Sequence, residues 1–168
     1  AYAVDDITIV RPMRDQTYGG DLNTLTCQCR IEVLAKPNAA IEARHNSAGS
    51  YTAIGTTDAN GRLIASPTFA MGSGSLDLRV VGQSTVHSVP AVRLGYLAVG
   101  FGQSNMVGTG GSLTLTVPST HASICYGAGT FYAWTATFGS QVSWVLLLLQ
   151  KSYDTYGVPV GMVMQALG

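Results

Sequence analysis

The sequence predicts two parts, an antiparallel β-sandwich over residues 1–94 and the beginning of an α/β domain with a parallel sheet over residues 95–168. In the first part, apolar and polar residues alternate with a period of two, and turn-forming residues separate the alternating runs. In the second part, an apolar run is followed further along the chain by a helical pattern and then by another apolar run. A strand, a crossover and a second apolar strand are typical of a parallel sheet.

The alternation is clearest over residues 25–33 and 76–80. The apolar positions, which we expect to face the core of the sandwich, are Leu25, Cys27, Cys29, Ile31 and Val33, then Leu76, Leu78 and Val80. Shorter β-prone runs occupy residues 6–10, 39–43, 51–56 and 62–65, and turn signals occupy residues 18–21, 46–49, 58–61 and 72–74. Short strands at this spacing, without a helical period, indicate a β-sandwich.

The second part begins with an apolar run at residues 96–99 and turns helical from Ser143. Trp144, Leu147, Leu148 and Lys151 fall on related helix faces, and Gly157 followed by Pro159 ends the helix. Residues 158–164 are expected to form the next buried strand. The polar, Gly-rich residues 109–141 predict a long loop, in which Tyr132 and Trp134 either line a sugar-binding rim or simply pack.

Composition narrows the function classes. Hydrophobic residues make up 46% of the chain and charged residues 11%, with nine basic and nine acidic side chains. The absence of a basic cluster argues against nucleic acid as a partner. The longest purely apolar run, residues 145–149, is far shorter than the roughly 20 residues that span a bilayer. No signal peptide or initiator Met opens the sequence, so we expect Ala1 to follow residues that it does not include.

The cysteines Cys27, Cys29 and Cys125 do not form a disulfide framework. Cys27 and Cys29 lie two residues apart, where on a strand they point to the same face as neighbours, so we expect all three thiols to be free and buried. The C-x-C pair has no second pair and no nearby His, which makes zinc a poor fit. No phosphate-binding Gly-Lys-Ser occurs, and Asn105 stands where a dinucleotide motif needs Gly. We therefore expect no metal and no cofactor.

The stretch Gly102-Gln103-Ser104-Asn105-Met106 is the strongest candidate for chemistry. It follows the apolar run at 96–99 and leads into a Gly-rich loop, which leaves room for a substrate and for N–H groups aimed at an oxyanion. It is not the G-x-S-x-G nucleophile elbow, because Met106 replaces the second Gly. The structural alternative is a polar turn after a strand.

These five residues resemble the first block of the SGNH-type carbohydrate esterases, the sialate O-acetylesterase-like family. A second match lies at Tyr156-Gly157-Val158-Pro159-Val160-Gly161, followed by Ala166-Leu167-Gly168, which stops at the first glycine of the family's next turn. The resemblance covers residues 95–168. In the first part, the turn at 58–61 and the strand at 76–80 resemble bacterial immunoglobulin-like modules.

The resemblance implies a carbohydrate O-acetylesterase acting on an acetylated polysaccharide outside the cell. Ser104 would be the nucleophile and supply one oxyanion N–H, and Gly168 would lie near the oxyanion turn. Gln103 would orient the Ser104 turn, and Asn105 would fix the loop or be purely structural.

The family's Asp-x-x-His motif is missing. Of the histidines, we expect His45 and His87 to be surface or turn residues, while His121 has Pro118 in place of the required Asp. We therefore expect these 168 residues to be a segment of a longer chain, inactive alone, with the catalytic His and Asp elsewhere.

The rival interpretation is a structural or host-attachment component of a phage tail or fibre. Such a protein would be virion-associated and would bind copies of itself or other tail proteins. Its esterase domain would be mobile or inactive.

Overall fold

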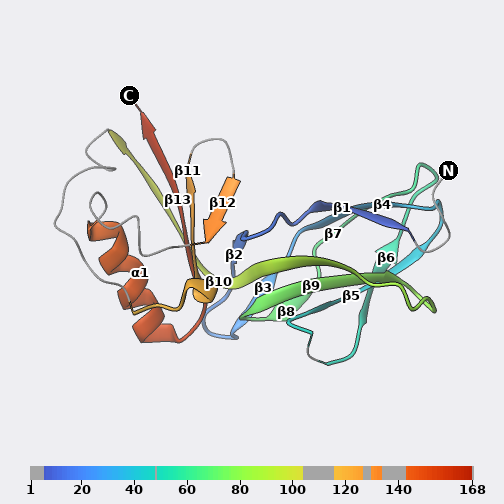
Figure 1. Ribbon diagram of the computed structural model, residues 1–168, viewed down its shortest axis with the longest axis horizontal. Coiled ribbons are helices and arrows are strands. Elements are labelled where there is room, and N and C mark those ends of the chain that lie inside the picture. Colours follow the sequence, from blue (N-terminus) through green and yellow to red (C-terminus); the bar gives the residue numbers. More distant parts are fainter. Residues whose placement is uncertain (1–5, 48, 104–115, 127–129, 134–142, 168) are drawn as a thin grey trace.

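The structure, a computed structural model, describes residues 6–47, 49–103, 116–126, 130–133 and 143–167. Most of these residues lie in β-strands, with both antiparallel and parallel pairing. Figure 1 shows two regions side by side, which we call the antiparallel part (residues 6–94) and the parallel part (residues 95–167). The predicted combination of an antiparallel region with a parallel sheet is confirmed at this level.

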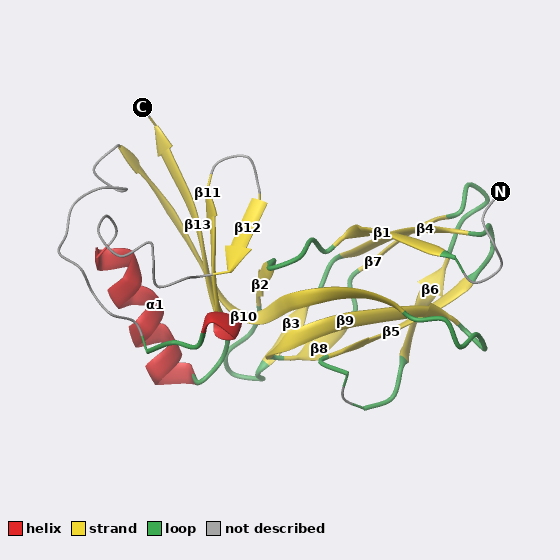
Figure 2. Ribbon diagram, viewed as in Figure 1, coloured by secondary structure: helices red, strands yellow, loops and turns green. Residues whose placement is uncertain are grey.

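The strands of the antiparallel part form three groups around one core. They are β1 (Ile7–Arg11), β2 (Thr17–Gly19), β3 (Thr26–Gln28), β4 (Ile31–Ala35), β5 (Ala40–His45), β6 (Thr52–Thr56), β7 (Arg62–Ala65), β8 (Thr68–Ala70) and β9 (Gly72–Val80). The three-stranded sheet β1-β4-β7 and the two-stranded sheet β3-β8 are antiparallel, and β6-β5-β9 form an antiparallel run that continues into β10 (His87–Gln103). These strands are coloured yellow in Figure 2.

The predicted core face is confirmed, with one exception. Cys27, Cys29, Ile31 and Val33 are all 0–1% exposed and belong to one apolar cluster. Leu25, however, is 51% exposed and has a left-handed backbone with φ of 52°. The alternating residues 25–33 do not form one strand: they divide into β3, which pairs with β8, and β4, which pairs with β1 and β7 in a separate sheet. The alternation survives this break because both strands border the same core.

Strand β10 is the element common to both parts. Its 17 residues pair antiparallel with β9 over the first half and parallel with β13 (Val160–Leu167) over the second half. The short strand β2 also pairs with β10, in parallel, at Arg93–Gly95. The sheet is therefore continuous across the position where the sequence analysis divides the chain.

Helix α1 (Ser143–Tyr156) ends just before Gly157, which has a positive φ of 63°, as the sequence predicts. Its buried positions include Leu149 and Ser152. Leu147 is 53% exposed and Lys151 is exposed, so these two residues, four positions apart, lie on the solvent-facing side of the helix. Within the described residues, no helix is long and apolar enough to cross a membrane.

The expected long loop at 109–141 contains regular structure. A 3-10 helix η2 (Ser119–His121) leads into β11 (Ala122–Tyr126), which lies beside β13 in parallel, and β12 (Thr130–Ala133) pairs antiparallel with β11. These short strands carry no strong alternation of polarity. Neighbouring strands rather than local sequence define them. Trp134 and the side chain of Tyr132 lie outside the described residues.

Candidate active site

The carboxyl ends of β10 and β13 lie at the same edge of the parallel sheet. Their register runs from Tyr96 opposite Val160 to Gln103 opposite Leu167. Ser104 is the next residue after β10, and Gly168 is the next after β13. Ligand sites in sheets of this kind lie outside the carboxyl ends of the strands. Ser104, Asn105, Gly168 and the side chain of Gln103 lie outside the described residues, so their predicted roles stay predictions.

Glycines allow close approach where the parallel strands begin. A Cβ on Gly95 would collide with the carbonyl oxygen of Pro159, and Tyr96 N donates a hydrogen bond to that same oxygen at 2.8 Å. A Cβ on Gly161 would collide with the side chain of Thr17. Glycine is therefore needed at both positions for steric reasons. The contact of Gly95 and Tyr96 with Pro159 lies where the parallel register of β10 and β13 begins, and this register places the carboxyl ends of the two strands side by side.

Helix α1 covers one side of these strands (Figure 1). Tyr156 stacks on Tyr96 with ring centroids 6.2 Å apart, and Leu149 and Met162 are both buried. Val99, in contrast, is 54% exposed. The strand that leads to Ser104 thus contacts α1 at its beginning, through the ring of Tyr96.

None of the histidines lies near the carboxyl ends of the strands. His121 directly precedes β11, whose first residue, Ala122, is in register with Val160 and through it with Tyr96. From Tyr96 to Gln103 are seven strand steps of about 3.3 Å, so His121 lies roughly 23 Å from the end of β10 that precedes Ser104. Its ring instead packs edge-on against the ring of Tyr153, with the two ring centroids 5.7 Å apart.

The other two histidines belong to the antiparallel part. His87 opens β10 and is half-buried. His45 was expected at the surface, but it ends β5 and is only 8% exposed, so that prediction is wrong. Its side chain lies on the same face of β5 as Ile41 and Ala43, and Nε2 is 3.1 Å from the carbonyl oxygen of Val92.

The cysteines are not alternative nucleophiles. All three are free and buried, as predicted. Burial raises the pKa of Cys27 to about 11 and that of Cys29 to about 12, so both remain protonated thiols at neutral pH. Among the described residues, no group of three His, Cys, Asp or Glu side chains is placed to hold a metal ion.

A polar junction that the sequence did not predict lies between the two parts. Arg93 is 1% exposed, and its guanidinium donates to Asp15 Oδ1 at 3.2 Å and to the carbonyl oxygen of Thr120 at 2.9 Å. Ser73 Oγ donates to the same Thr120 oxygen, and the hydroxyls of Thr17 and Ser123 hydrogen-bond across the junction. A charged residue inside the apolar run Val92-Arg93-Leu94 was the available signal.

Comparison with solved structures finds a similar fold. A carbohydrate acetylesterase from Xanthomonas citri superposes with a TM-score of 0.64 and 18% sequence identity, over 95% of this chain and 40% of that chain. At this identity the likeness shows the fold alone, and this chain spans two fifths of the length of that acetylesterase. No family model and no curated protein matches the sequence. The phage-tail alternative gains no support from these comparisons.

Proposed function

We propose that this chain supplies the nucleophile-bearing region of a carbohydrate O-acetylesterase of the SGNH type, preceded by an immunoglobulin-like β-sandwich. The observation that carries the proposal is the register of β10 and β13, whose carboxyl ends directly precede Ser104 and Gly168. The fold shared with a carbohydrate acetylesterase is consistent with it. An acetylated polysaccharide is the proposed substrate and an extracellular site the proposed location.

The proposed reaction follows the chemistry of serine esterases. Ser104 Oγ attacks the acetyl carbonyl while a general base takes its proton, and the sugar oxygen leaves as an alcohol after receiving that proton. Water then attacks the acetyl-enzyme and releases acetate, which regenerates the Ser104 hydroxyl. The N–H of Ser104, together with an N–H at or just after Gly168, would hold the oxyanion.

The general base is assigned to residues other than the histidines of this sequence. His121 lies at the opposite end of the strands, and His45 and His87 belong to the antiparallel part. A base must come within hydrogen-bonding reach of the proton that it takes, either directly or through one water. We therefore expect the catalytic His and Asp to come from outside these 168 residues, and we expect these residues alone to be inactive.

The test is acetate release from an O-acetylated glycan or a small acetyl ester by the full-length protein. Ser104→Ala should abolish the reaction, with a rate loss on the order of 10⁶, because the hydroxyl carries the covalent step. Ser66→Ala, at an exposed position of the antiparallel part, is the matched control and should retain full activity. Unchanged acetate release by Ser104→Ala would remove Ser104 from the mechanism.

Activity of the 168-residue chain alone tests the second half of the proposal. We expect none above the uncatalysed rate. Robust acetate release by this chain would mean that its own histidines include the base, and His121→Gln would then identify or exclude the one that precedes β11.

A further inference from the structure

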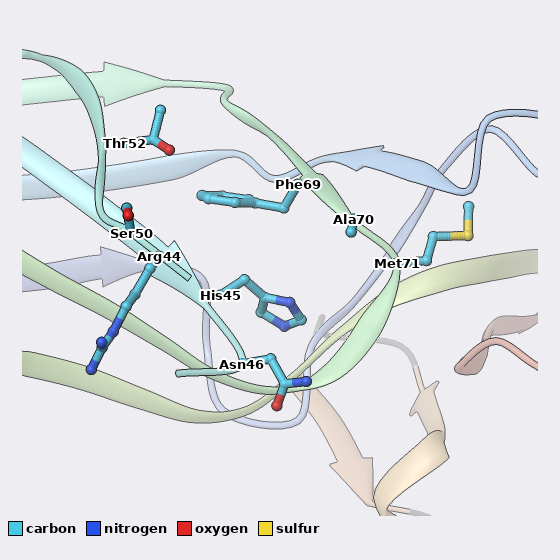
Figure 3. A pocket seen from close by; sticks show the side chains of 8 residues that line it. All are labelled: Arg44, His45, Asn46, Ser50, Thr52, Phe69, Ala70 and Met71. Carbon is cyan, nitrogen blue, oxygen red and sulfur yellow. The ribbon is translucent and has the colours of Figure 1, made fainter. Parts of the chain in front are cut away.

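A pocket opens at one end of the antiparallel part, away from the strand ends that precede Ser104. Its volume is about 220 Å³, and it is lined by Arg44, His45, Asn46, Ser50, Thr52, Phe69, Ala70 and Met71. Figure 3 shows the rings of Phe69 and His45 turned toward the same space, with Ser50 and Thr52 on one side and Met71 on the other. The lining thus combines an aromatic ring with several short polar side chains.

The hydrogen bond of His45 defines what this ring offers to the pocket. A carbonyl oxygen can only accept, so the 3.1 Å contact with Val92 places the proton of the neutral ring on Nε2. Nδ1 is then an acceptor, and no described residue donates to it. The pocket therefore presents an acceptor suited to a hydroxyl group.

The turn after β5 holds Asn46 at the rim. Asn46 has a left-handed backbone with φ of 62°, and its N–H donates to the carbonyl oxygen of Ser75 at 2.8 Å. Gly74 leaves the space that the Asn46 side chain occupies, because a Cβ there would collide with Asn46 Oδ1. An amide with both donor and acceptor capacity is thus fixed beside His45.

The pocket has no unbalanced charge. The guanidinium of Arg44 is 3.1 Å from Asp77 Oδ2 and lies over the ring of Tyr51 at 4.7 Å, so its charge is already paired. Burial lowers the pKa of His45, which keeps its ring neutral at neutral pH. This balance favours an uncharged ligand over a phosphate or a carboxylate.

We propose that this pocket binds one ring of a neutral glycan. A sugar ring has a face of C–H groups, which packs against the negative face of an aromatic ring such as Phe69, and a rim of hydroxyls. These hydroxyls can donate to His45 Nδ1 and exchange hydrogen bonds with Asn46 and Thr52. The site would hold a polysaccharide to the antiparallel part, and it does not depend on the assignment of Ser104.

The experiment is a titration of the 168-residue chain, followed by backbone amide NMR shifts. The probes are the methyl β-pyranosides of D-glucose, D-galactose and D-xylose, each added to about 50 mM, because a ligand this small is expected to bind with a dissociation constant on the order of 1 mM. We expect at least one probe to give saturable shifts at His45, Asn46, Thr52 and Phe69. The methyl glucuronide should bind no better than the glucoside.

Two variants test the contacts, because truncating Phe69 risks the adjoining core. Phe69→Leu, which keeps apolar volume but removes the aromatic face, should weaken binding by about 2- to 12-fold. Thr52→Val should weaken it by about 2- to 12-fold through loss of the hydroxyl. Thr56→Val, exposed on the same strand outside the pocket, should leave binding unchanged.

Three results would overturn the proposal. They are the absence of saturable shifts with all three pyranosides, shifts confined to residues outside the pocket, and unchanged affinity in both Phe69→Leu and Thr52→Val. Acetate release is not measured here, so failure of this site is distinct from failure of the esterase assignment.

Discussion

At the scale of single residues, His45 shows how burial changes the chemistry of a side chain. On β5, Ile41, Ala43 and His45 share one buried face, and the imidazole reaches the Val92 carbonyl from it. Desolvation is the largest influence on the ring and lowers its pKa below 6.5, while the hydrogen bond to Val92 and the negative charge of Asp77 act in the opposite direction. The folded state therefore binds this proton less readily than the unfolded state.

This difference predicts a loss of stability on acidification. Because the unfolded state binds more protons, stability is fully present above the unfolded pKa of about 6.5 and falls as pH drops below it, by at most about 1.4 kcal/mol per pH unit. Urea unfolding of the wild type and of His45→Gln should give curves that diverge between about pH 7.5 and 5.5, with the wild type losing more stability. If the stabilities of the two proteins changed with pH in parallel, His45 would not contribute to the pH dependence of stability.

At the scale of elements, β10 is positioned by the strands on both sides of it. It joins β9 in the antiparallel part to β13 in the parallel part, and β2 adds a short parallel contact at the crossing. At Gly95 the backbone of β10 passes so close to Pro159 that a side chain has no room. The register that places Gln103 of β10 opposite Leu167 of β13 depends on this contact.

Gly95→Ala should therefore destabilise the fold by about 1–3 kcal/mol, as overpacking does elsewhere. Gly72→Ala is the matched control, because a Cβ there meets its nearest atoms at 3.9 and 4.0 Å, an ordinary contact distance, and its free energy of unfolding should change by less than about 1 kcal/mol. Chemical denaturation measures both. Equal stabilities of the two variants would show that the β10–β13 contact relaxes without cost.

At the scale of the whole molecule, local patterns predicted the elements better than the contacts between them. Period-two alternation identified the buried face of residues 27–33, and Gly157 followed by Pro159 identified the end of α1. The exposed Leu25 and the break before β4 were not predicted, because alternation does not distinguish one strand from two successive strands that face the same core. The polar junction at Arg93 was not predicted, because the partners of Arg93, Asp15 and Thr120, are 78 and 27 residues away in sequence.

Arg93 is the polar contact on which the joining of the two parts should depend most. Its guanidinium also donates to the carbonyl oxygens of Asp15 and Ala91 at 3.1 and 3.2 Å, and Arg93→Met would leave both oxygens without this donor. Among the described residues, the Asp15 carboxylate would keep only Arg14, a 76% exposed side chain 3.5 Å away, as its ion partner. Removing one partner of a buried ion pair costs about 3–5 kcal/mol. The control is Arg62→Met, whose lost ion pair with Glu32 is 50% exposed on the arginine side and should cost no more than about 1 kcal/mol.

Hydrogen exchange measured by mass spectrometry locates the effect. In Arg93→Met, amides of β11 and α1 in the parallel part should exchange faster than in the wild type, while those of β5 and β9 should keep more of their protection, because the core between Ile41 and Leu78 does not include the guanidinium. Uniform acceleration throughout the chain would show instead that the antiparallel and parallel parts unfold as one cooperative unit. Protection equal to that of Arg62→Met would show that the sheet alone, through β10, holds them together.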